Sequence, residues 1–216
     1  MKYIYLIVFL ILGSNLTSQI NTPKYSNEFL NIGVGARSLA MSNSVITSTN
    51  SAMSGYLNPA NLIKNENDIQ IGLMHAEYFA GIAKYDFGSI SKRIDDKSSF
   101  GFSFLRFGVD NIPNTSELID AQGNVNYDRV SYFSAADLAF IGSYARKLNK
   151  YLSVGGSAKI INRKAGDFAS AWGFGIDLSS TYSKNDWSFA LVAKDITSTF
   201  NVWKYQLSNE MISAFI

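Results

Sequence analysis

The sequence of 216 residues contains no cysteine, one histidine and three prolines. Without cysteine there can be no disulfide, thiolate metal ligand, thiol nucleophile or acylated lipoprotein N-terminus. A histidine-based metal site or a Ser-His pair would depend on His75 alone, so we interpret His75 as an ordinary strand residue. Charge is also scarce: 17% of residues are charged, the net charge is +2, and the basic residues are scattered singly. This pattern argues against a nucleic-acid partner.

The chain also lacks an apolar run long enough for a membrane-spanning helix, which needs about 20 residues. Its longest candidate, Ile4 to Leu12, follows Lys2 and precedes a polar stretch that ends near the small residue Ser18. A short apolar run with a basic start and a small residue before the cleavage point is typical of a secretory signal. We therefore predict a signal peptide over residues 1–18 and a mature protein that leaves the cytoplasm.

What the sequence does contain, from Asp68 onward, is apolar residues at every second position. In the stretch AWGFGIDLSSTYS (171–183), one set of alternate positions is bulky and the other is small or polar. Such a period predicts β-strands with one apolar and one polar face. Roughly seven strands of this kind follow one another, and most are longer than the 5 to 6 residues common in soluble proteins.

Two architectures fit such strands, and they differ in which face is inside. In a secreted β-sandwich the apolar face is the core, whereas in an outer-membrane barrel it contacts lipid. We favour the barrel, because the polar faces are mostly Gly, Ser, Ala and Thr and because aromatics such as Trp172 and Tyr182 bracket the apolar faces like interfacial girdles. Short turns near 95–97, 149–150 and 184–186 alternate with other connections, including a long one at about 110–135 and a last one from 195 to about 209, as in such barrels.

The strand count leaves the architecture open, since a closed bacterial barrel needs an even number of strands and at least eight. Either one strand is missed or the chain ends before its barrel does. We therefore expect an all-β, antiparallel outer-membrane β-barrel over residues 67–216, truncated to about seven or eight strands. Residues 19–66, rich in Gly, Asn and small residues, have little alternation and are predicted to be irregular or briefly helical.

Motifs for catalysis are weak throughout. Gly33-Val34-Gly35 with Arg37 lacks the preceding strand and the Lys-Ser or Lys-Thr of a phosphate loop, so a tight turn is preferred. Asp95-Asp96 lacks the spaced ligands of a calcium loop and is interpreted as a solvated turn. The alternation places Asp86, Asp177 and Lys159 on lumen-facing positions. We expect no enzymatic activity, cofactor or metal.

The segment EFLNIGVGARSLAMSNSVITSTNSAMSGYLNPANL (28–62) resembles the N-terminal signature of the PorV/PorQ family of outer-membrane proteins. Ser42, Leu57 and Asn61 stand where that family usually has Gly, Trp and Gly. The matching positions, which we take as a candidate plug motif, are Gly35, Ala36, Arg37, Met41, Asn58, Pro59 and Ala60. The Asn-Pro-Ala element is also similar to the plug of FadL-type transporters, to which the family's barrel is thought to be related.

The resemblance implies a FadL-like barrel of about fourteen strands, with residues 19–66 folded inside as a plug or hatch. It also implies a non-enzymatic role in the outer membrane: assisting type IX protein secretion by interacting with secreted cargo proteins or with translocon and attachment components. The expected partners are therefore outer-membrane lipid and those proteins, and the outer loops, especially 111–132, are the candidate contact surface. The alternative is a FadL-like transporter of hydrophobic small molecules.

Overall fold

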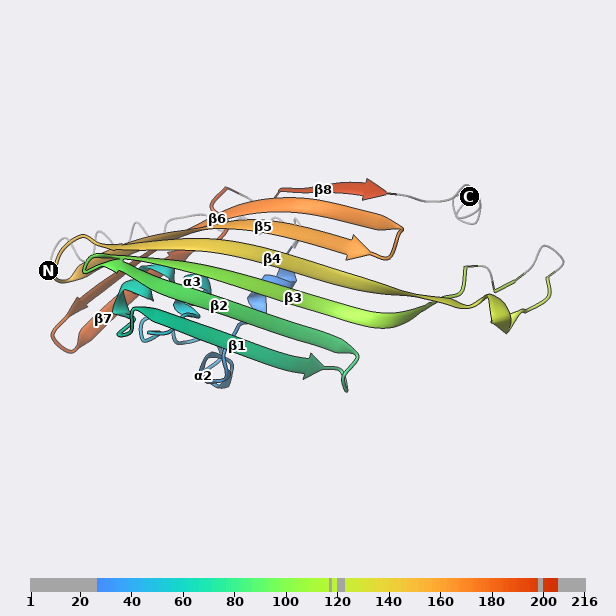
Figure 1. The fold of residues 1–216 in the computed structure, drawn as a ribbon, viewed down its shortest axis with the longest axis horizontal. Coiled ribbons are helices and arrows are strands. Elements are labelled where there is room, and N and C mark those ends of the chain that lie inside the picture. Colours follow the sequence, from blue (N-terminus) through green and yellow to red (C-terminus); the bar gives the residue numbers. More distant parts are fainter. Residues whose placement is uncertain (1–26, 117, 120–122, 198–199, 206–216) are drawn as a thin grey trace, which may run out of the picture.

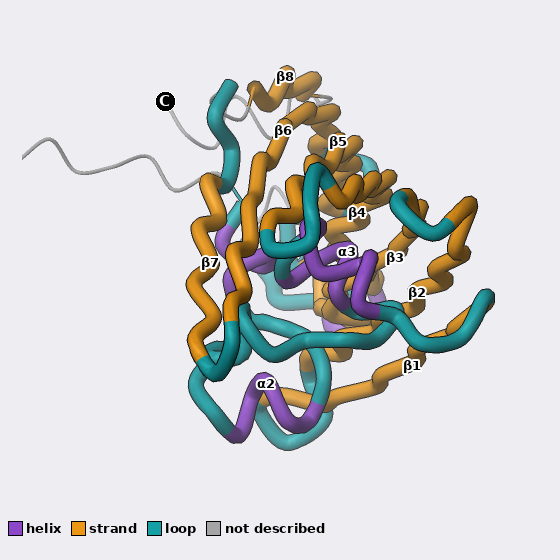
Figure 2. The backbone as a smooth tube through the Cα atoms, turned by 90° about the vertical axis from the view of Figure 1, so that its left-hand side faces the viewer, coloured by secondary structure: helices purple, strands orange, loops and turns teal. Residues whose placement is uncertain are grey.

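The computed structural model describes residues 27–116, 118–119, 123–197 and 200–205. The predicted signal peptide lies outside the described residues. The chain forms one antiparallel β-sheet that curls into an open half-barrel (Figures 1 and 2). The prediction of an antiparallel, all-β sheet is therefore confirmed, and the sheet has the curl of a half-barrel.

The sheet follows the chain order from β1 to β7, each strand pairing with the next, while β8 pairs with β6. The strands are β1 (Ile69–Tyr78), β2 (Ala83–Asp95), β3 (Ser98–Asn114), β4 (Ser131–Lys147), β5 (Leu152–Ala165), β6 (Ala169–Lys184), β7 (Trp187–Ala193) and β8 (Phe200–Tyr205). The first seven correspond to the predicted strands, and the short turns between β2 and β3, β4 and β5, and β6 and β7 lie where the sequence placed them.

The prediction of a connection from 195 to about 209 is wrong over the described residues, because β8 lies within it. β7 and β8 occupy successive parts of the same edge of β6: β7 pairs with Leu178–Lys184 and β8 with Ala169–Phe174. Together they act as one strand interrupted by a loop. The interruption left β8 too short for its alternation to stand out.

The loop between β3 and β4 is also shorter than predicted, since both strands are 17 residues long and extend well past the rest of the sheet (Figure 1). Beyond the ends of β2 and β5, these strands pair only with each other, through Ile112–Asn114 and Ser131–Phe133. The hairpin therefore projects from the half-barrel and carries the short helix η3 (Tyr127–Arg129) near its tip.

Residues 27–65 lie within the curl of the sheet (Figure 2). They form short helices joined by turns: η1 (Glu28–Asn31), α2 (Ala36–Ala40), α3 (Ser54–Leu57) and η2 (Pro59–Lys64). This agrees with the irregular or briefly helical character expected from their composition. Among the described residues, no helix has the length and apolar character needed to cross a membrane.

Most of the convex, outward face of the sheet is apolar and exposed, and a group of charged residues on it lies on β1 to β3. On β6 the bulky residues Trp172, Phe174, Leu178 and Tyr182 are 40 to 59% exposed, whereas their small or polar neighbours Gly173, Gly175, Asp177 and Ser179 are buried. No second layer covers this face within the part of the chain that the structure describes. The apolar side of the ribbon is therefore the outside, as the barrel interpretation required and a sandwich does not allow.

The apolar face of β6 extends along most of the strand. The ten-residue step from Trp172 to Tyr182 corresponds to about 34 Å along a strand. At a tilt of about 40° it spans about 26 Å, close to the ~25 Å apolar band of outer-membrane barrels. Trp172 and Tyr182 therefore lie near the two ends of the apolar stretch of β6.

β2 has the opposite orientation from the one the sequence predicted. Tyr85 and Phe87 face inward and are 0 and 3% exposed, because residues 27–57 pack on them. Asp86, expected in the lumen, therefore faces outward. The alternation identified the two faces of β2 correctly, but its larger side chains meet protein rather than the outside.

Candidate functional site

The candidate site is the contact between residues 27–65 and the concave, inner face of the sheet. That face has two parts, which we call the polar half and the apolar half. The polar half comprises Ser143, Gly155, Ser157, Ser179 and Thr181 on β4 to β6. The apolar half comprises Tyr85, Phe87, Leu105 and Phe107 on β2 and β3 with Ile161 on β5. Register places the members of each half on the inner face of neighbouring strands.

Asn58-Pro59-Ala60 docks on the polar half. The Asn58 side chain caps η2 by accepting a hydrogen bond from the Ala60 N–H at 3.1 Å, and Pro59 occupies the first turn, where its missing N–H costs nothing. The Asn58 amide donates to the Ile46 carbonyl at 2.7 Å and to the Thr181 hydroxyl at 2.9 Å. Asn58 and Ala60 are fully buried.

Small residues on the sheet allow this backbone to approach closely. A Cβ placed on Gly155 would lie 2.4 Å from the Ala60 nitrogen and 2.5 Å from the Pro59 carbonyl carbon. Beside it, the Ser179 hydroxyl accepts a hydrogen bond from the Ala60 N–H at 2.9 Å. Glycine at 155 is therefore required by the contact and not by a turn.

A second set of hydrogen bonds fixes α3 to the same half. Ser143 donates to the Gly55 carbonyl at 2.7 Å, Ser157 donates to it at 3.2 Å, and the two hydroxyls are 2.9 Å apart. Asn61 is buried and donates to the Ile46 carbonyl at 2.9 Å. The small, polar residues of β4 to β6 thus serve as hydrogen-bonding partners for a backbone.

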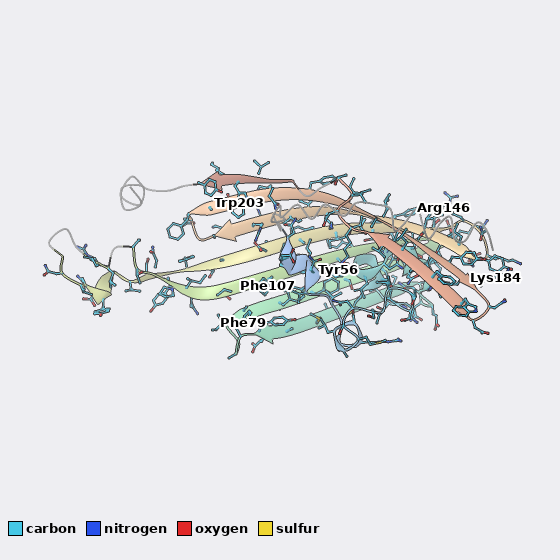
Figure 3. The ribbon with its side chains drawn as sticks, turned by 180° about the vertical axis from the view of Figure 1, so that it is seen from behind. Tyr56, Phe79, Phe107, Arg146, Lys184 and Trp203 are labelled. Atoms are coloured by element: carbon cyan, nitrogen blue, oxygen red, sulfur yellow. The ribbon has the colours of Figure 1, made fainter. Side chains whose placement is uncertain are left out.

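The apolar half holds the preceding residues by packing. Phe29, Leu30 and Tyr56 join Phe87 and Leu105 in one buried cluster, and the Tyr56 and Phe87 rings meet edge to face at 5.6 Å. The Tyr56 hydroxyl donates to the Leu30 carbonyl. Burial raises the pKa of Tyr56 to about 12, so this hydroxyl remains protonated at neutral pH. Figure 3 shows Tyr56 facing the sheet near Phe107.

The glycine part of the candidate motif lies away from Asn-Pro-Ala. Gly33 and Gly35 have φ of 95° and 85°, which glycine adopts readily, and they form the predicted tight turn before α2. The Gly35 N–H donates to the Met74 sulfur at 3.0 Å. Ala36 and Arg37 are exposed, and Met41 is 46% exposed. The seven motif residues are therefore not gathered into one site.

A buried charge cluster joins the two halves. The Lys159 ammonium lies 2.8 Å from Asp177 and 2.6 Å from Asp195, and the Lys159 and Asp177 side chains are only 4 and 8% exposed. Both residues face inward, as predicted. The sequence analysis missed Asp195, which follows β7 with φ of 52° and folds over Gly175, where a Cβ would lie 2.6 Å from its carboxylate. The indication of this contact in the sequence was Gly175, two positions before Asp177 on β6, which leaves space for the Asp195 carboxylate.

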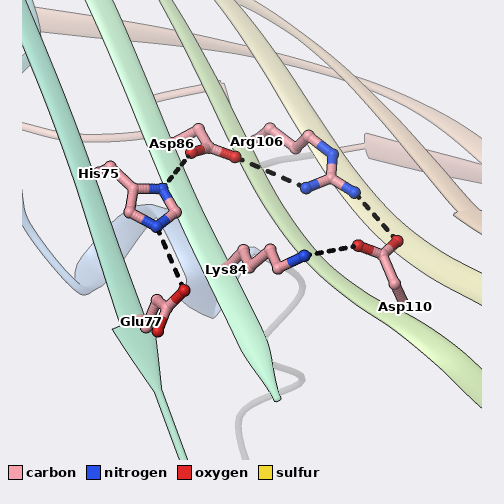
Figure 4. A network of polar contacts seen from close by, with 6 residues as sticks. All are labelled: His75, Glu77, Lys84, Asp86, Arg106 and Asp110. Atoms are coloured by element: carbon pink, nitrogen blue, oxygen red, sulfur yellow. Dashed lines mark hydrogen bonds and ion pairs between the residues drawn. The ribbon is translucent and has the colours of Figure 1, made fainter. Parts of the chain in front are cut away.

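Outward-facing Asp86 belongs to a different network, on β1 to β3. His75 contacts Asp86 at 2.6 Å and Glu77 at 3.6 Å (Figure 4). His75 is a strand residue, as interpreted, with carboxylate partners that the sequence did not indicate. Among the described residues, no three His, Asp or Glu side chains are placed to hold a metal ion.

A scan of the sequence against protein-family models finds no match, and a search of curated proteins finds no significant relative.

Proposed function

We propose that this chain forms part of an outer-membrane β-barrel in which residues 27–65 act as a plug, and that it assists protein export as a non-enzymatic interaction component resembling the PorV/PorQ family. One observation carries the proposal: the exposed side of the sheet is apolar, and its small, polar side is buried under Asn58-Pro59-Ala60. This arrangement is the reverse of that in a water-soluble sheet.

The physical basis of the membrane placement is that the outward face is solvated better by lipid than by water. Residues such as Leu73, Leu178 and Trp172 are 52 to 78% exposed, and together with their neighbours they make an apolar surface that water solvates poorly. Lipid removes that cost. In lipid, each unpaired backbone group costs several kcal/mol, so the outer edges of β1 and of β7 with β8 require further strand partners in the intact barrel.

The projecting β3–β4 hairpin is the contact surface that we assign to cargo or secretion components. It extends past the rest of the sheet, and Ile119, Tyr127 and Tyr132 are 63 to 77% exposed on it. Exposed aromatic residues on a projecting loop are typical of protein-binding surfaces.

Membrane placement is tested with Ile176→Arg. Ile176 faces outward near the middle of the apolar band, and an arginine there costs about 2 to 4 kcal/mol in a bilayer. The free energy of unfolding is measured by urea titration of the protein refolded into vesicles. An unchanged midpoint, or a folded monomer in plain buffer, contradicts the placement.

The export role is tested in the source bacterium by deleting the gene and measuring the proteins released to the surface and medium. We expect several exported proteins to accumulate in the periplasm. The double variant Tyr127→Ser with Tyr132→Ser reproduces the defect if the hairpin is the contact surface, whereas Phe79→Ser, an exposed aromatic in the β1–β2 turn, does not. Normal export in the deletion strain refutes the role.

The second candidate, a transporter of hydrophobic small molecules, is favoured by one observation. A hollow of about 220 Å³ on the inner face is lined by Phe107 and Trp203 and by the Asp137–Arg163 ion pair, whose closest atoms are 2.8 Å apart. A lipid-like molecule that co-purifies with the protein and is lost in Trp203→Ala would support transport. Export defects without such a ligand support the first proposal.

A further inference from the structure

The outward face differs between two parts of the half-barrel along one hydrogen-bonded row of the sheet. Register aligns His75, Asp86 and Arg106 on β1 to β3 with Leu138, Asn162 and Trp172 on β4 to β6. The first three are ionisable, whereas the last three carry no charge. His75 lies three residues before the end of β1 and Asp86 three residues after the start of β2, so the charged row is close to the β1–β2 turn. On the proposed membrane placement, this end of the strands is the part nearest the lipid head groups.

The charges of this row and its neighbours alternate in sign (Figure 4). Arg106 lies 3.6 Å from Asp86 and 3.3 Å from Asp110, and Lys84 lies 3.6 Å from Asp110. With Glu77 and His75, the network contains three carboxylates and three basic groups. Their side chains are 28 to 57% exposed, so each retains hydrogen-bonding capacity toward the outside.

Two glycines shape the surface around the network. Gly108 leaves room for the Arg106 side chain, since a Cβ there would lie 2.9 Å from the guanidinium carbon. Gly88 lies one row below Asp86, between Leu73 and Phe104. Its missing side chain leaves a shallow hollow of about 420 Å³, lined by these apolar residues and, at its upper end, by His75 and Asp86.

We propose that this surface binds a phospholipid whose head group carries both a phosphate and a primary ammonium, as in phosphatidylethanolamine. An acyl chain lies in the hollow over Gly88, against Leu73 and Phe104. The phosphate accepts hydrogen bonds from Arg106 and Lys84, and the ammonium donates to the carboxylates. This inference rests on the proposed placement of the sheet in a membrane.

Charge complementarity selects this lipid over others. A purely anionic head group pairs with Lys84 and Arg106. It is repelled by the three carboxylates of the network. A choline head group has the same charges, but its quaternary ammonium has no N–H to donate to these carboxylates. A head group with alternating charge and donors matches a surface of alternating charge.

The test is native mass spectrometry of the full chain, refolded in vesicles of equal phosphatidylethanolamine, phosphatidylcholine and phosphatidylglycerol. We expect retained phosphatidylethanolamine to exceed each other lipid by about tenfold, the factor of one charge-assisted hydrogen bond. Gly88→Leu fills the hollow and abolishes retention. Gly142→Leu is the matched control, because Gly142 is also on the outward face and a Cβ there meets nothing within 4 Å.

A second pair of variants tests the head-group contact. The double variant Asp86→Asn with Asp110→Asn removes the preference for phosphatidylethanolamine over phosphatidylglycerol. Asp167→Asn is the control and keeps the preference for phosphatidylethanolamine. Asp167 does not belong to this surface, because it pairs with Lys164 at a distance of 3.5 Å. Equal retention of all lipids by the inserted wild-type protein, or full retention by Gly88→Leu, overturns the inference. Failure of the wild-type protein to insert into vesicles overturns the proposed membrane placement itself.

Discussion

The two halves of the inner face hold one segment of chain by different means. The apolar half binds residues 27–57 through buried aromatic and aliphatic side chains such as Phe87 and Leu105, and it has few donors and acceptors. The polar half binds residues 54–61 through hydroxyls and through the absence of a side chain at Gly155. An inner barrel wall therefore need not be polar. Its character follows what is packed on it.

The largest difference between the halves is expected at their buried charges. Lys159→Ala leaves Asp177, which is only 8% exposed, without the ammonium that pairs with it, so we expect the free energy of unfolding to fall by about 3 to 5 kcal/mol. Urea titration in vesicles measures it. Lys164→Ala is the control: the Lys164 and Asp167 side chains are 61 and 98% exposed, and the change should be below about 1 kcal/mol. Equal effects would mean that the Lys159 cluster is hydrated.

In the apolar half, the loss of packing should dominate. Leu105 is fully buried in the cluster that contains Phe29, Leu30 and Tyr56, and Leu105→Ala should lower the free energy of unfolding by about 2 to 5 kcal/mol through the cavity that it leaves. The matched variant Leu73→Ala removes the same atoms from the outward face, where Leu73 is 78% exposed and no cavity forms, and should cost much less. A larger loss for Leu73→Ala than for Leu105→Ala would reverse the assignment of inside and outside.

In the polar half, adding atoms should be worse than removing them. Gly155→Val forces its side chain into the Pro59–Ala60 backbone, and overpacking of this kind costs about 1 to 3 kcal/mol. Gly142→Val meets no neighbour and should be close to neutral. Limited proteolysis within residues 27–65 provides a second measurement, since only Gly155→Val should expose them. Similar protection in both variants would contradict tight docking.

The smallest effect is expected at single hydroxyls. Ser179→Ala removes the 2.9 Å hydrogen bond from the Ala60 N–H, although Asn58 still accepts from that donor, so about 1 kcal/mol should be lost. Ser180→Ala, one position along on the outward face, should be silent. A pair of equal effects from these adjacent serines would mean that the alternation does not set the facing of β6.

The sequence predicted most strands because strict alternation over 10 or more residues has few other interpretations. β8, whose six residues follow an irregular loop, was not predicted. The hairpin of β3 and β4 was predicted to be shorter than it is. For the candidate site, the resemblance pointed to Asn58, Pro59 and Ala60. The alternation of the strands placed Lys159 and Asp177 on the inner face. The sequence contained no indication of their partners, since Thr181 and Ser179 lie 123 and 119 positions away from the residues that they contact.

The orientation of β2 shows the limit most clearly. Alternation assigned Tyr85 and Phe87 to one face and Asp86 to the other, but the side on which each face lies depends on what covers it. Phe29, Leu30 and Tyr56 cover the first pair, and no local pattern in β2 records this.

By itself, the sequence therefore determined which residues share a face, where the sheet turns and how little chemistry the chain carries, because these properties depend on neighbours along the chain. Only the tertiary structure decided that the small, polar face holds a segment of backbone, that Asp195 completes a buried charge cluster, and that Asp86 faces outward. These depend on contacts between residues distant in the chain, which form only when the sheet curls around residues 27–65.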